Sequence, residues 1–254
     1  MNPEPVPQPL LDFFKVHGRI ALAFSGGTDS SYLLYAAVRS GCDVTAYSVE
    51  SVFRSPVERE NAVSVSEMLG VRPVLLGADI LSVPGVSANG PDRCYLCKKA
   101  IFAAMRKRAD DDGIEDLCDA TNASDDPSER PGMRALEEMG VLSPLREAGI
   151  TKDDVRELSR RAGLPCWSAP SDSCLATRMS PGVEITETNL GRTAEAEAAL
   201  RSIGFSGFRV RTLPDGTASL QIQESQMTLF KSNEGAVEGI LAPRYGGFAV
   251  SLRE

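Results

Sequence analysis

The sequence predicts an α/β protein, with a doubly wound parallel sheet followed by a smaller C-terminal α+β domain. Helix-length stretches alternate with short β-branched runs over the first two-thirds of the 254 residues, a glycine turn joins the first strand to a helix, and the alternation stops near residue 180. Such alternation forms crossovers between parallel strands. Ligands bind these sheets at the carboxyl ends of the strands, so the first glycine turn marks the expected site.

Hydrophobic periodicity and segment length predict the elements of the first part. The strands are expected at 19–24, 43–49, 71–76 and 116–120. The helices are expected at 30–40, 57–69, 94–109, 132–140 and 152–162. Two loops, 82–93 and 122–132, interrupt the alternation, and loops of this length in a compact domain tend to be lids or binding segments.

The element order changes after residue 180. A helix at 188–203 precedes strands at 208–213 and 217–222, a helix at 224–240 and a last strand at 246–252. The chain is therefore expected to divide into a flexible, proline-rich segment (1–15), a domain built on the parallel sheet (16–175) and a smaller α+β domain (180–254).

Composition narrows the classes of function. The formal net charge is −8, whereas proteins that bind tRNA or DNA ordinarily present a basic face, so a small-molecule substrate is favoured over nucleic acid. No apolar run approaches the ~20 residues of a membrane helix and no secretory signal is visible, which predicts a cytoplasmic protein with no membrane partner. His17 is the single histidine, which argues against Ser-His-Asp and Cys-His catalysis and histidine-containing zinc sites.

Residues 25–30 read Ser-Gly-Gly-Thr-Asp-Ser between a strand and a helix. Gly26 and Gly27 permit a tight turn whose N–H groups, with those of the helix start, favour an anion. Ser25 and Ser30 add hydroxyl donors, and Asp29 suits Mg²⁺. The loop lacks the lysine of a Walker A motif and the spacing of a dinucleotide fold, so another kind of phosphate-binding turn is predicted. A plain serine-rich capping turn is the alternative.

Six cysteines are present, and in a cytoplasmic protein we expect them to be reduced. Cys94 and Cys97 form a C-x-x-C at a helix start, where the helix dipole and basic neighbours favour thiolate. Cys174 lies in a polar turn at the domain junction. Three thiolates could hold an iron–sulfur cluster with one open iron, or a zinc with an outside fourth ligand, while a redox pair and structural cysteines are the alternatives. Cys42 and Cys118 are expected in the core.

Arg209 and Arg211 alternate along an expected strand and therefore share one face. Two guanidinium groups on one face suit a phosphate or carboxylates, although a solvated strand face has the same pattern. Glu195 and Glu197, on the preceding helix, are expected to be surface charges.

These motifs occur in an order that is similar to that of one enzyme family. The matching segments are Ser25–Ser30, Pro91–Lys99, Asp119–Asn122, Arg130–Gly132, Ser143–Leu145, Leu164–Trp167, Pro170–Arg178 and Arg209–Arg211. Over almost its whole length the chain resembles the LarE-type ATP-dependent sulfur transferases of the PP-loop ATP pyrophosphatase superfamily. The PP-loop (Ser25–Ser30) by itself is weakly specific, but the ordered set is strongly so.

The resemblance implies ATP and Mg²⁺ as cofactors and pyridinium-3,5-biscarboxylic acid mononucleotide as substrate. One substrate carboxylate is adenylated with release of pyrophosphate and then becomes a thiocarboxylate, a step in building the nickel-pincer nucleotide cofactor. The implied ATP-binding residues are Ser25, Gly26, Gly27, Asp29, Ser30 and Thr121, with Asp29 holding Mg²⁺. The implied ligands of the substrate phosphate are Arg178, Arg209 and Arg211. A homo-oligomer, trimer or hexamer, is also implied.

The family has two sulfur sources. In one branch the cysteine matching Cys174 loses its sulfur and becomes dehydroalanine. In the other, cysteines matching Cys94, Cys97 and Cys174 hold a catalytic [4Fe–4S] cluster whose open iron carries a spare sulfide. All three are present, which favours the cluster route. Gln221 stands where the family has a carboxylate, which argues against a metal role there, and Cys166 stands where threonine is usual, which offers an extra ligand or sulfur donor.

Three other classes fit part of the pattern. A PP-loop tRNA thiolase uses the same loop and three cysteines, but the acidic balance and the absence of an obvious RNA-binding module count against it. An ammonia-dependent PP-loop ligase would not need the cysteines. A non-enzymatic adenine-nucleotide-binding protein would bind nucleotide without releasing pyrophosphate, and it leaves Arg209 and Arg211 unexplained.

Overall fold

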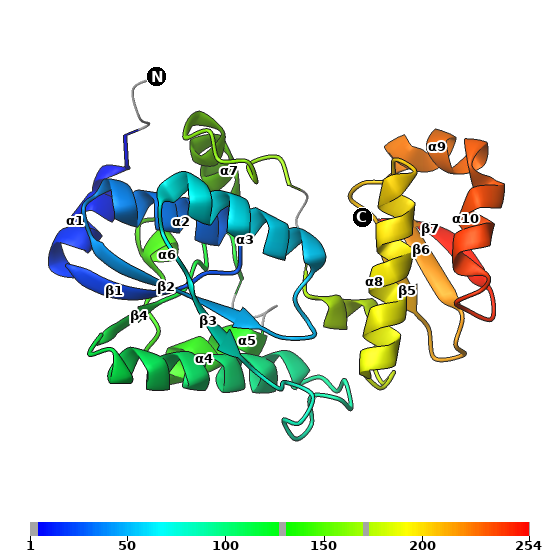
Figure 1. Ribbon diagram of the computed structural model, residues 1–254, viewed down its shortest axis with the longest axis horizontal. Coiled ribbons are helices and arrows are strands. Elements are labelled where there is room, and N and C mark those ends of the chain that lie inside the picture. The colour runs from blue at the N-terminus through cyan, green and yellow to red at the C-terminus, as the bar shows by residue number, and fades with distance from the viewer. Residues whose placement is uncertain (1–4, 127–130, 170–172, 254) are drawn as a thin grey trace. The chain divides into compact units, whose positions relative to one another are not determined.

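In the computed structural model, four parallel strands form the sheet of the first of two units, in the order β3-β2-β1-β4 (Figure 1). The structure describes residues 5–126, 131–169 and 173–253. The strands are β1 (Arg19–Ala23), β2 (Asp43–Glu50), β3 (Val74–Gly77) and β4 (Asp116–Cys118). The strand order reverses between β1 and β4, and ligands of doubly wound sheets bind at the carboxyl end of such a reversal.

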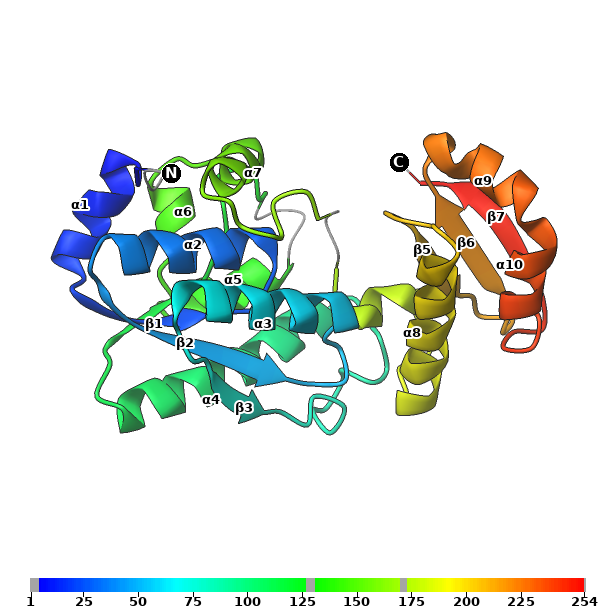
Figure 2. The same ribbon diagram turned by 45° about the horizontal axis from the view of Figure 1, so that its top comes forward.

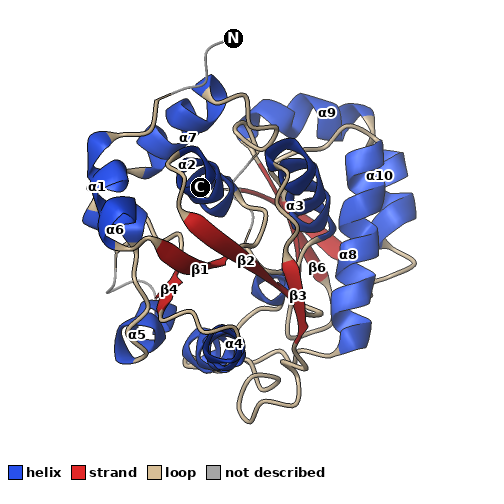
Figure 3. Ribbon diagram, turned by 60° about the vertical axis from the view of Figure 1, so that its left-hand side comes forward, coloured by secondary structure: helices blue, strands red, loops and turns tan. Residues whose placement is uncertain are grey.

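Helices cover both faces of this sheet (Figure 3). One face carries α1 (Gln8–Val16), α2 (Thr28–Arg39), α3 (Pro56–Leu69), α6 (Pro144–Glu147) and α7 (Lys152–Arg161). The other carries α4 (Arg93–Asp111) and α5 (Pro131–Glu138). Along β1, Ile20 and Leu22 join the core of the first face, and Ala21 joins the core of the second. The predicted α/β class with a parallel, doubly wound sheet is confirmed.

The second unit contains a three-stranded sheet in the order β5-β6-β7 (Figure 2). Its elements are η1 (Leu175–Arg178), α8 (Glu187–Ser202), β5 (Arg209–Thr212), β6 (Ala218–Ile222), η2 (Glu224–Gln226), α9 (Met227–Ser232), α10 (Glu234–Leu241) and β7 (Phe248–Leu252). β5 runs antiparallel to β6, and β7 runs parallel to it. Helices α8 and α10 bury Leu200 and Leu241 with the inward residues of β6, which confirms a smaller α+β unit.

The two units are not contiguous in the sequence. The first comprises Met1–Ser51, Pro56–Ile80 and Cys94–Ala169, and the second comprises Val52–Ser55, Leu81–Arg93 and Pro170–Glu254. The loop segments Val52–Ser55 and Leu81–Arg93, which follow β2 and β3, therefore belong to the second unit. The Leu175 N–H, for example, donates to the Phe53 carbonyl at 2.9 Å.

Four expectations about the elements need correction. The segment 1–15 is not flexible throughout, because α1 buries Leu10 and Phe14 in the core. The strand expected at 71–76 begins at Val74, since Pro73 has no N–H for the ladder. The helix expected at 224–240 is broken near Asn233, whose side-chain amide donates to the Leu229 carbonyl and competes with helical bonding. Helix α6 was not expected at all, because one short turn leaves no periodicity to read.

None of the described helices is both long enough and apolar enough to cross a membrane.

Candidate active site

The PP-loop leaves the carboxyl end of β1 and turns into α2. Gly26 has a φ of +89°, and a Cβ there would lie 2.3 Å from the Glu58 carbonyl oxygen and 2.7 Å from the Ala62 nitrogen. Both are backbone atoms of α3, which cannot move aside cheaply. Glycine is thus required by both the conformation and the space, and the loop passes directly against α3.

The hydroxyl groups of the PP-loop are ordered by the loop itself. Ser25 Oγ and Ser30 Oγ lie 3.1 Å apart, the Gly27 N–H donates to Ser25 Oγ at 3.2 Å, and Ser30 Oγ lies 3.1 Å from the Gly27 carbonyl. Gly27 caps α2, whose first N–H groups have no partner within the helix. The predicted strand, turn and helix start come together as an anion-binding arrangement at the sheet edge.

Asp29, in the first turn of α2, has one paired and one unpaired oxygen. Its Oδ2 accepts from Lys152 Nζ at 2.6 Å. Its Oδ1 is buried and has no hydrogen-bond partner among the described residues. An orphaned carboxylate oxygen beside an anion site fits the role predicted for Asp29, because Mg²⁺ binds through one or two carboxylates together with phosphate oxygens.

Lys152 is a site residue that the sequence analysis missed. It is the first residue of α7, where Thr151 caps the helix and forms a capping box with Asp154. A lysine in the first helical turn opposes the helix dipole, and this mismatch is the local signal that could have singled it out. Its partner Asp29 lies 123 positions away in the sequence, so the pairing itself left no local trace.

The segment after β4 lies at the same edge of the sheet as the PP-loop, because β4 pairs with β1 (Leu22 opposite Cys118). Asp119 accepts from both the N–H and the hydroxyl of Thr121, and from Ser143 Oγ at 2.7 Å. These bonds end the strand early and fix Thr121, the predicted ATP-binding residue, beside the loop's strand. The Lys152 N–H donates to Ser124 Oγ, which ties the start of α7 to this segment.

Cys166 lies directly behind the PP-loop. Its carbonyl accepts from Thr28 Oγ1 at 3.0 Å, and its side chain is buried. Burial raises the pKa of the Cys166 thiol. Burial and the higher pKa both disfavour the thiolate that a ligand or sulfur donor needs.

The remaining core cysteines behave as expected. Cys118 is fully buried, and burial raises the pKa of its thiol. Cys42 is partly buried, and burial together with Asp43 raises the pKa of its thiol to about 11. Both thiols therefore remain protonated near neutral pH.

Cys94 and Cys97 lie one turn apart at the start of α4, and both are partly exposed. Tyr95, between them, donates its hydroxyl to Glu138 at 2.7 Å, and the Arg134 guanidinium lies 4.0 Å from the centre of its ring. The start of α4 is thereby held against α5. Gly132 allows the close approach, since a Cβ there would lie 3.0 Å from the Lys98 side chain.

Cys174 belongs to the second unit, where it precedes the 3-10 helix η1 and its carbonyl accepts from Thr177 Oγ1. It is partly exposed. Within the described residues, no group of three or more His, Cys, Asp or Glu side chains is arranged to hold a metal ion.

Arg209 and Arg211 share one face of β5, because Val210 and Thr212 between and beside them are buried in the opposite direction. The Nε of Arg211 is buried with no hydrogen-bond partner among the described residues. Burial lowers the pKa of Arg211, and so does repulsion from Arg178 and Arg253. A half-buried cation beside other cations is costly unless an anion completes it, which suits the predicted phosphate ligand.

Arg178 is engaged in a different way. It is 1% exposed, donates Nε to Glu197 Oε1 at 2.9 Å and Nη2 to Glu197 Oε2 at 3.2 Å, and also reaches the Ser173 carbonyl. Glu197 additionally accepts from Arg201 and from the Val210 N–H. The expectation that Glu197 is a surface charge was wrong, because it is buried to neutralise Arg178 and to anchor β5.

Glu195 is a surface charge as expected. Its side chain is 72% exposed, and it lies 3.8 Å from Arg244. Four residues of the predicted motifs, Arg130 and 170–172, lie outside the described residues.

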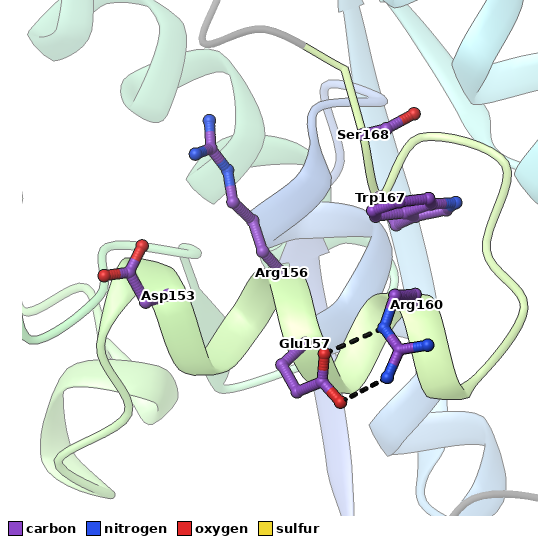
Figure 4. A pocket seen from close by; sticks show the side chains of 6 residues that line it. All are labelled: Asp153, Arg156, Glu157, Arg160, Trp167 and Ser168. Atoms are coloured by element: carbon purple, nitrogen blue, oxygen red, sulfur yellow. Dashed lines mark hydrogen bonds and ion pairs between the residues drawn. The ribbon is translucent and has the colours of Figure 1, made fainter.

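An open groove lies along α7 and the segment after it (Figure 4). Its lining residues are Asp153, Arg156, Glu157, Arg160, Trp167 and Ser168. Arg160 and Glu157 form a bidentate ion pair beside the 41%-exposed Trp167. The groove contains none of the predicted site residues.

A parallel sheet whose first strand leads through Ser-Gly-Gly-Thr-Asp-Ser into a helix defines a PP-loop α/β protein. No family model matches the chain. It is 33% identical over 211 residues to the pyridinium-3,5-bisthiocarboxylic acid mononucleotide synthase of Lactiplantibacillus plantarum, covering 82% of this chain and 76% of that protein. The chain belongs to this family, the LarE-type synthases.

Two uncharacterized proteins are also similar to the chain. One, from Synechocystis sp., is 33% identical over 222 residues, which cover 87% of this chain and 82% of that protein. The other, from Methanocaldococcus jannaschii, is 27% identical over 220 residues, which cover 87% of this chain and 84% of that protein.

Proposed function

We propose that this protein is an ATP-dependent sulfur transferase that converts a carboxylate of pyridinium-3,5-biscarboxylic acid mononucleotide to a thiocarboxylate, in the synthesis of the nickel-pincer nucleotide cofactor. Family membership supports the substrate, because the L. plantarum relative is named for the bisthiocarboxylic product. The observation that most directly supports ATP binding is the buried Asp29 oxygen, which has no hydrogen-bond partner among the described residues and lies beside a turn that requires glycine at position 26.

The first step is adenylation. A carboxylate oxygen of the substrate attacks the α-phosphorus of ATP, the bond to the bridging oxygen breaks, and pyrophosphate leaves with the electron pair. The N–H groups at the start of α2 and the hydroxyls of Ser25 and Ser30 bind the leaving phosphates. Asp29 would hold Mg²⁺, which offsets charge on those oxygens, and Lys152 adds a positive charge beside it.

The second step replaces AMP by sulfur. Adenylation makes the carboxyl carbon a good electrophile, so a sulfide or thiolate is nucleophile enough and no histidine base is needed. Cys94, Cys97 and Cys174 would hold a [4Fe–4S] cluster, which would supply a sulfide from its open iron.

A sacrificial route from Cys174 is the alternative sulfur source. The Cys174 thiolate displaces AMP to form a thioester. Loss of the Cys174 Cα proton then breaks its Cβ–S bond, the electron pair leaves on the thiocarboxylate, and dehydroalanine remains.

The second unit would bind the substrate phosphate through Arg209 and Arg211. Arg178 was expected to take part, but its guanidinium is already paired with the Glu197 carboxylate, so we assign the substrate phosphate to Arg209 and Arg211. A homo-oligomer, trimer or hexamer, remains a prediction of the family resemblance.

The test begins with iron and acid-labile sulfide, measured on protein purified without oxygen. About four irons per chain, lost in Cys94→Ala, are expected for the cluster route. A Cys174→Ala variant should form AMP and pyrophosphate from ATP and substrate but yield no thiocarboxylate. Equal loss of AMP formation would contradict this assignment. Protein without iron that loses the mass of one H₂S after turnover would instead show the sacrificial route.

A further inference from the structure

The sheet of the second unit has an apolar face and a polar face (Figure 2). On the apolar face, Val210 and Leu220 are buried with residues of α8 and α10. Successive residues of a strand point to opposite sides of a sheet. The polar face therefore carries the alternate positions of the three strands, which are Arg209, Arg211, Ser219, Gln221, Ala249 and Ser251.

Each arginine of β5 lies opposite a polar residue of β6. Arg209 pairs with Gln221, and Arg211 pairs with Ser219. Ser251 of β7 pairs with Gln221, and its Oγ lies 3.2 Å from Ser219 Oγ. A serine hydroxyl both donates and accepts hydrogen bonds. The two serines therefore offer paired hydroxyl groups beside the two guanidinium groups, an arrangement that suits a sugar hydroxyl next to an anion.

Arg253 brings a third guanidinium group to the polar face. Its N–H continues the ladder of β7 by donating to the Ile222 carbonyl at 2.8 Å, and it follows Ser251 by two positions, so the two side chains share a face. Its Nη1 reaches past the end of β6 and donates to the Gly207 carbonyl at 2.8 Å. This bond holds the guanidinium group beside the start of β5.

The positive charges near Arg211 favour an anion on this face. Burial lowers the pKa of Arg211, and repulsion from Arg178 and Arg253 adds to this effect. The Nε of Arg211 is also buried with no hydrogen-bond partner among the described residues. A phosphate monoester carries about two negative charges near neutral pH and has three acceptor oxygens, so it would relieve the repulsion and accept from several guanidinium groups at once.

We propose that this polar face binds the ribose 5-phosphate part of a mononucleotide, with Arg253 as a third phosphate ligand and Ser219 and Ser251 as the ligands of a ribose hydroxyl. The inference rests on the proposed function, which assigns the phosphate to Arg209 and Arg211. Neighbouring strands lie about 4.8 Å apart, so a sugar attached to a phosphate on β5 extends over β6, where the paired hydroxyls begin. Every contact that carries the inference lies within the second unit.

The test compares two phosphate monoesters as ligands of the full chain. Ribose 5-phosphate carries both groups that the polar face would bind, whereas methyl phosphate carries the monoester without the sugar. Phosphorus NMR titration measures each affinity, with ATP and Mg²⁺ present to saturate the PP-loop. Neither probe has a carboxylate to be adenylated, so binding is measured without turnover. We expect ribose 5-phosphate to bind about fivefold more tightly than methyl phosphate, as one added hydrogen bond predicts.

Arg253→Met should weaken the binding of both probes about tenfold, because it removes a charged donor from the phosphate. Arg253→Lys retains a cation and should preserve much of the affinity. Arg244→Met is the matched control, since Arg244 lies in the same unit and also donates to a backbone carbonyl, that of Ile240. It should leave both affinities unchanged.

Ser219→Ala should weaken the binding of ribose 5-phosphate about fivefold and leave that of methyl phosphate unchanged. Ser251→Ala should do the same, and it decides the question if Ser219→Ala fails to fold. Ser202→Ala is the matched control, because the Ser202 hydroxyl lies on α8 and donates to the Ala199 carbonyl. Neither probe should respond to it.

Three results would each overturn the inference: equal affinities of the unsubstituted chain for the two probes, unchanged affinities in Arg253→Met, or equal losses for the two probes in the serine variants. Thiocarboxylate formation is measured separately. Its absence in a chain that binds ribose 5-phosphate as expected would overturn the proposed function alone, so the two failures are distinguishable.

Discussion

The PP-loop of the first unit and the arginine face of β5 in the second unit both suit phosphate, but the interactions that would attract the phosphate differ between them. The loop offers backbone N–H groups and hydroxyls, and its acidic Asp29 is already paired with Lys152. The strand offers formal positive charge, at Arg211 with a buried nitrogen that no described residue satisfies. Binding by oriented dipoles depends on geometry, whereas attraction between full charges also depends on salt, with a Debye length of about 10 Å at 0.1 M. The loop should therefore be sensitive to steric change and the strand to charge change.

The largest expected effect is a loss of stability in the second unit, caused by removing the carboxylate that anchors β5 and its arginine face. Glu197→Ala leaves Arg178 buried without its carboxylate, which should lower the free energy of unfolding by about 3–5 kcal/mol. Urea denaturation followed by circular dichroism measures this. Glu195→Ala is the matched control on the same helix, and its exposed side chain predicts a change within about 0.5 kcal/mol. Similar losses in the two variants would contradict the buried role of Glu197.

A steric change in the PP-loop should weaken ATP binding and leave the arginine face of β5 unaffected. Gly26→Ala places a Cβ against the backbone of α3, and we expect ATP affinity to fall about a hundredfold by calorimetry. Gly27→Ala is the control, since its nearest obstacle is Ser25 Oγ at 3.3 Å and its φ is −69°. Comparable losses of ATP affinity in the two variants would show that the turn tolerates a side chain at neither glycine, so the requirement would not be specific to Gly26.

A change of charge on β5 should weaken substrate binding and leave ATP binding intact. Arg211→Met is expected to weaken binding of the substrate mononucleotide about tenfold or more and to flatten its dependence on salt, while ATP affinity is kept. Lys231→Met removes a cation from α9 in the same unit and should leave both unchanged. If Arg211→Met lowered the affinity for ATP as much as the affinity for the mononucleotide, the two regions would not bind different phosphates.

The smallest effect concerns the thiol behind the PP-loop. Cys166→Ala keeps the carbonyl that anchors Thr28, so ATP affinity and thiocarboxylate yield should both stay within about threefold of the unsubstituted chain. A total loss of thiocarboxylate with ATP affinity retained would make Cys166 a sulfur donor after all.

The sequence predicted the parallel sheet and the PP-loop well, because Gly26, Gly27 and the alternation of strands and helices are local signals that span a few residues. Contacts between residues far apart in the sequence could not be predicted in this way. Lys152 and Asp29 are 123 residues apart, and Arg178 and Glu197 meet only when η1 packs on α8. The contacts of Asn89 gave no signal either, since its side-chain amide donates to carbonyls 90 and more residues further along the chain.

The division of the chain into interleaved segments has a consequence for its modularity. The polypeptide passes between the two units after residues 51, 55, 80, 93 and 169, so neither unit is a single continuous stretch. Residues 173–253 expressed as a fragment would lack the partners supplied by Phe53, Asn89 and Arg93. Recombination could not exchange this C-terminal segment as a cassette for that of an unrelated protein, and the pair of units has to be inherited, engineered and folded together.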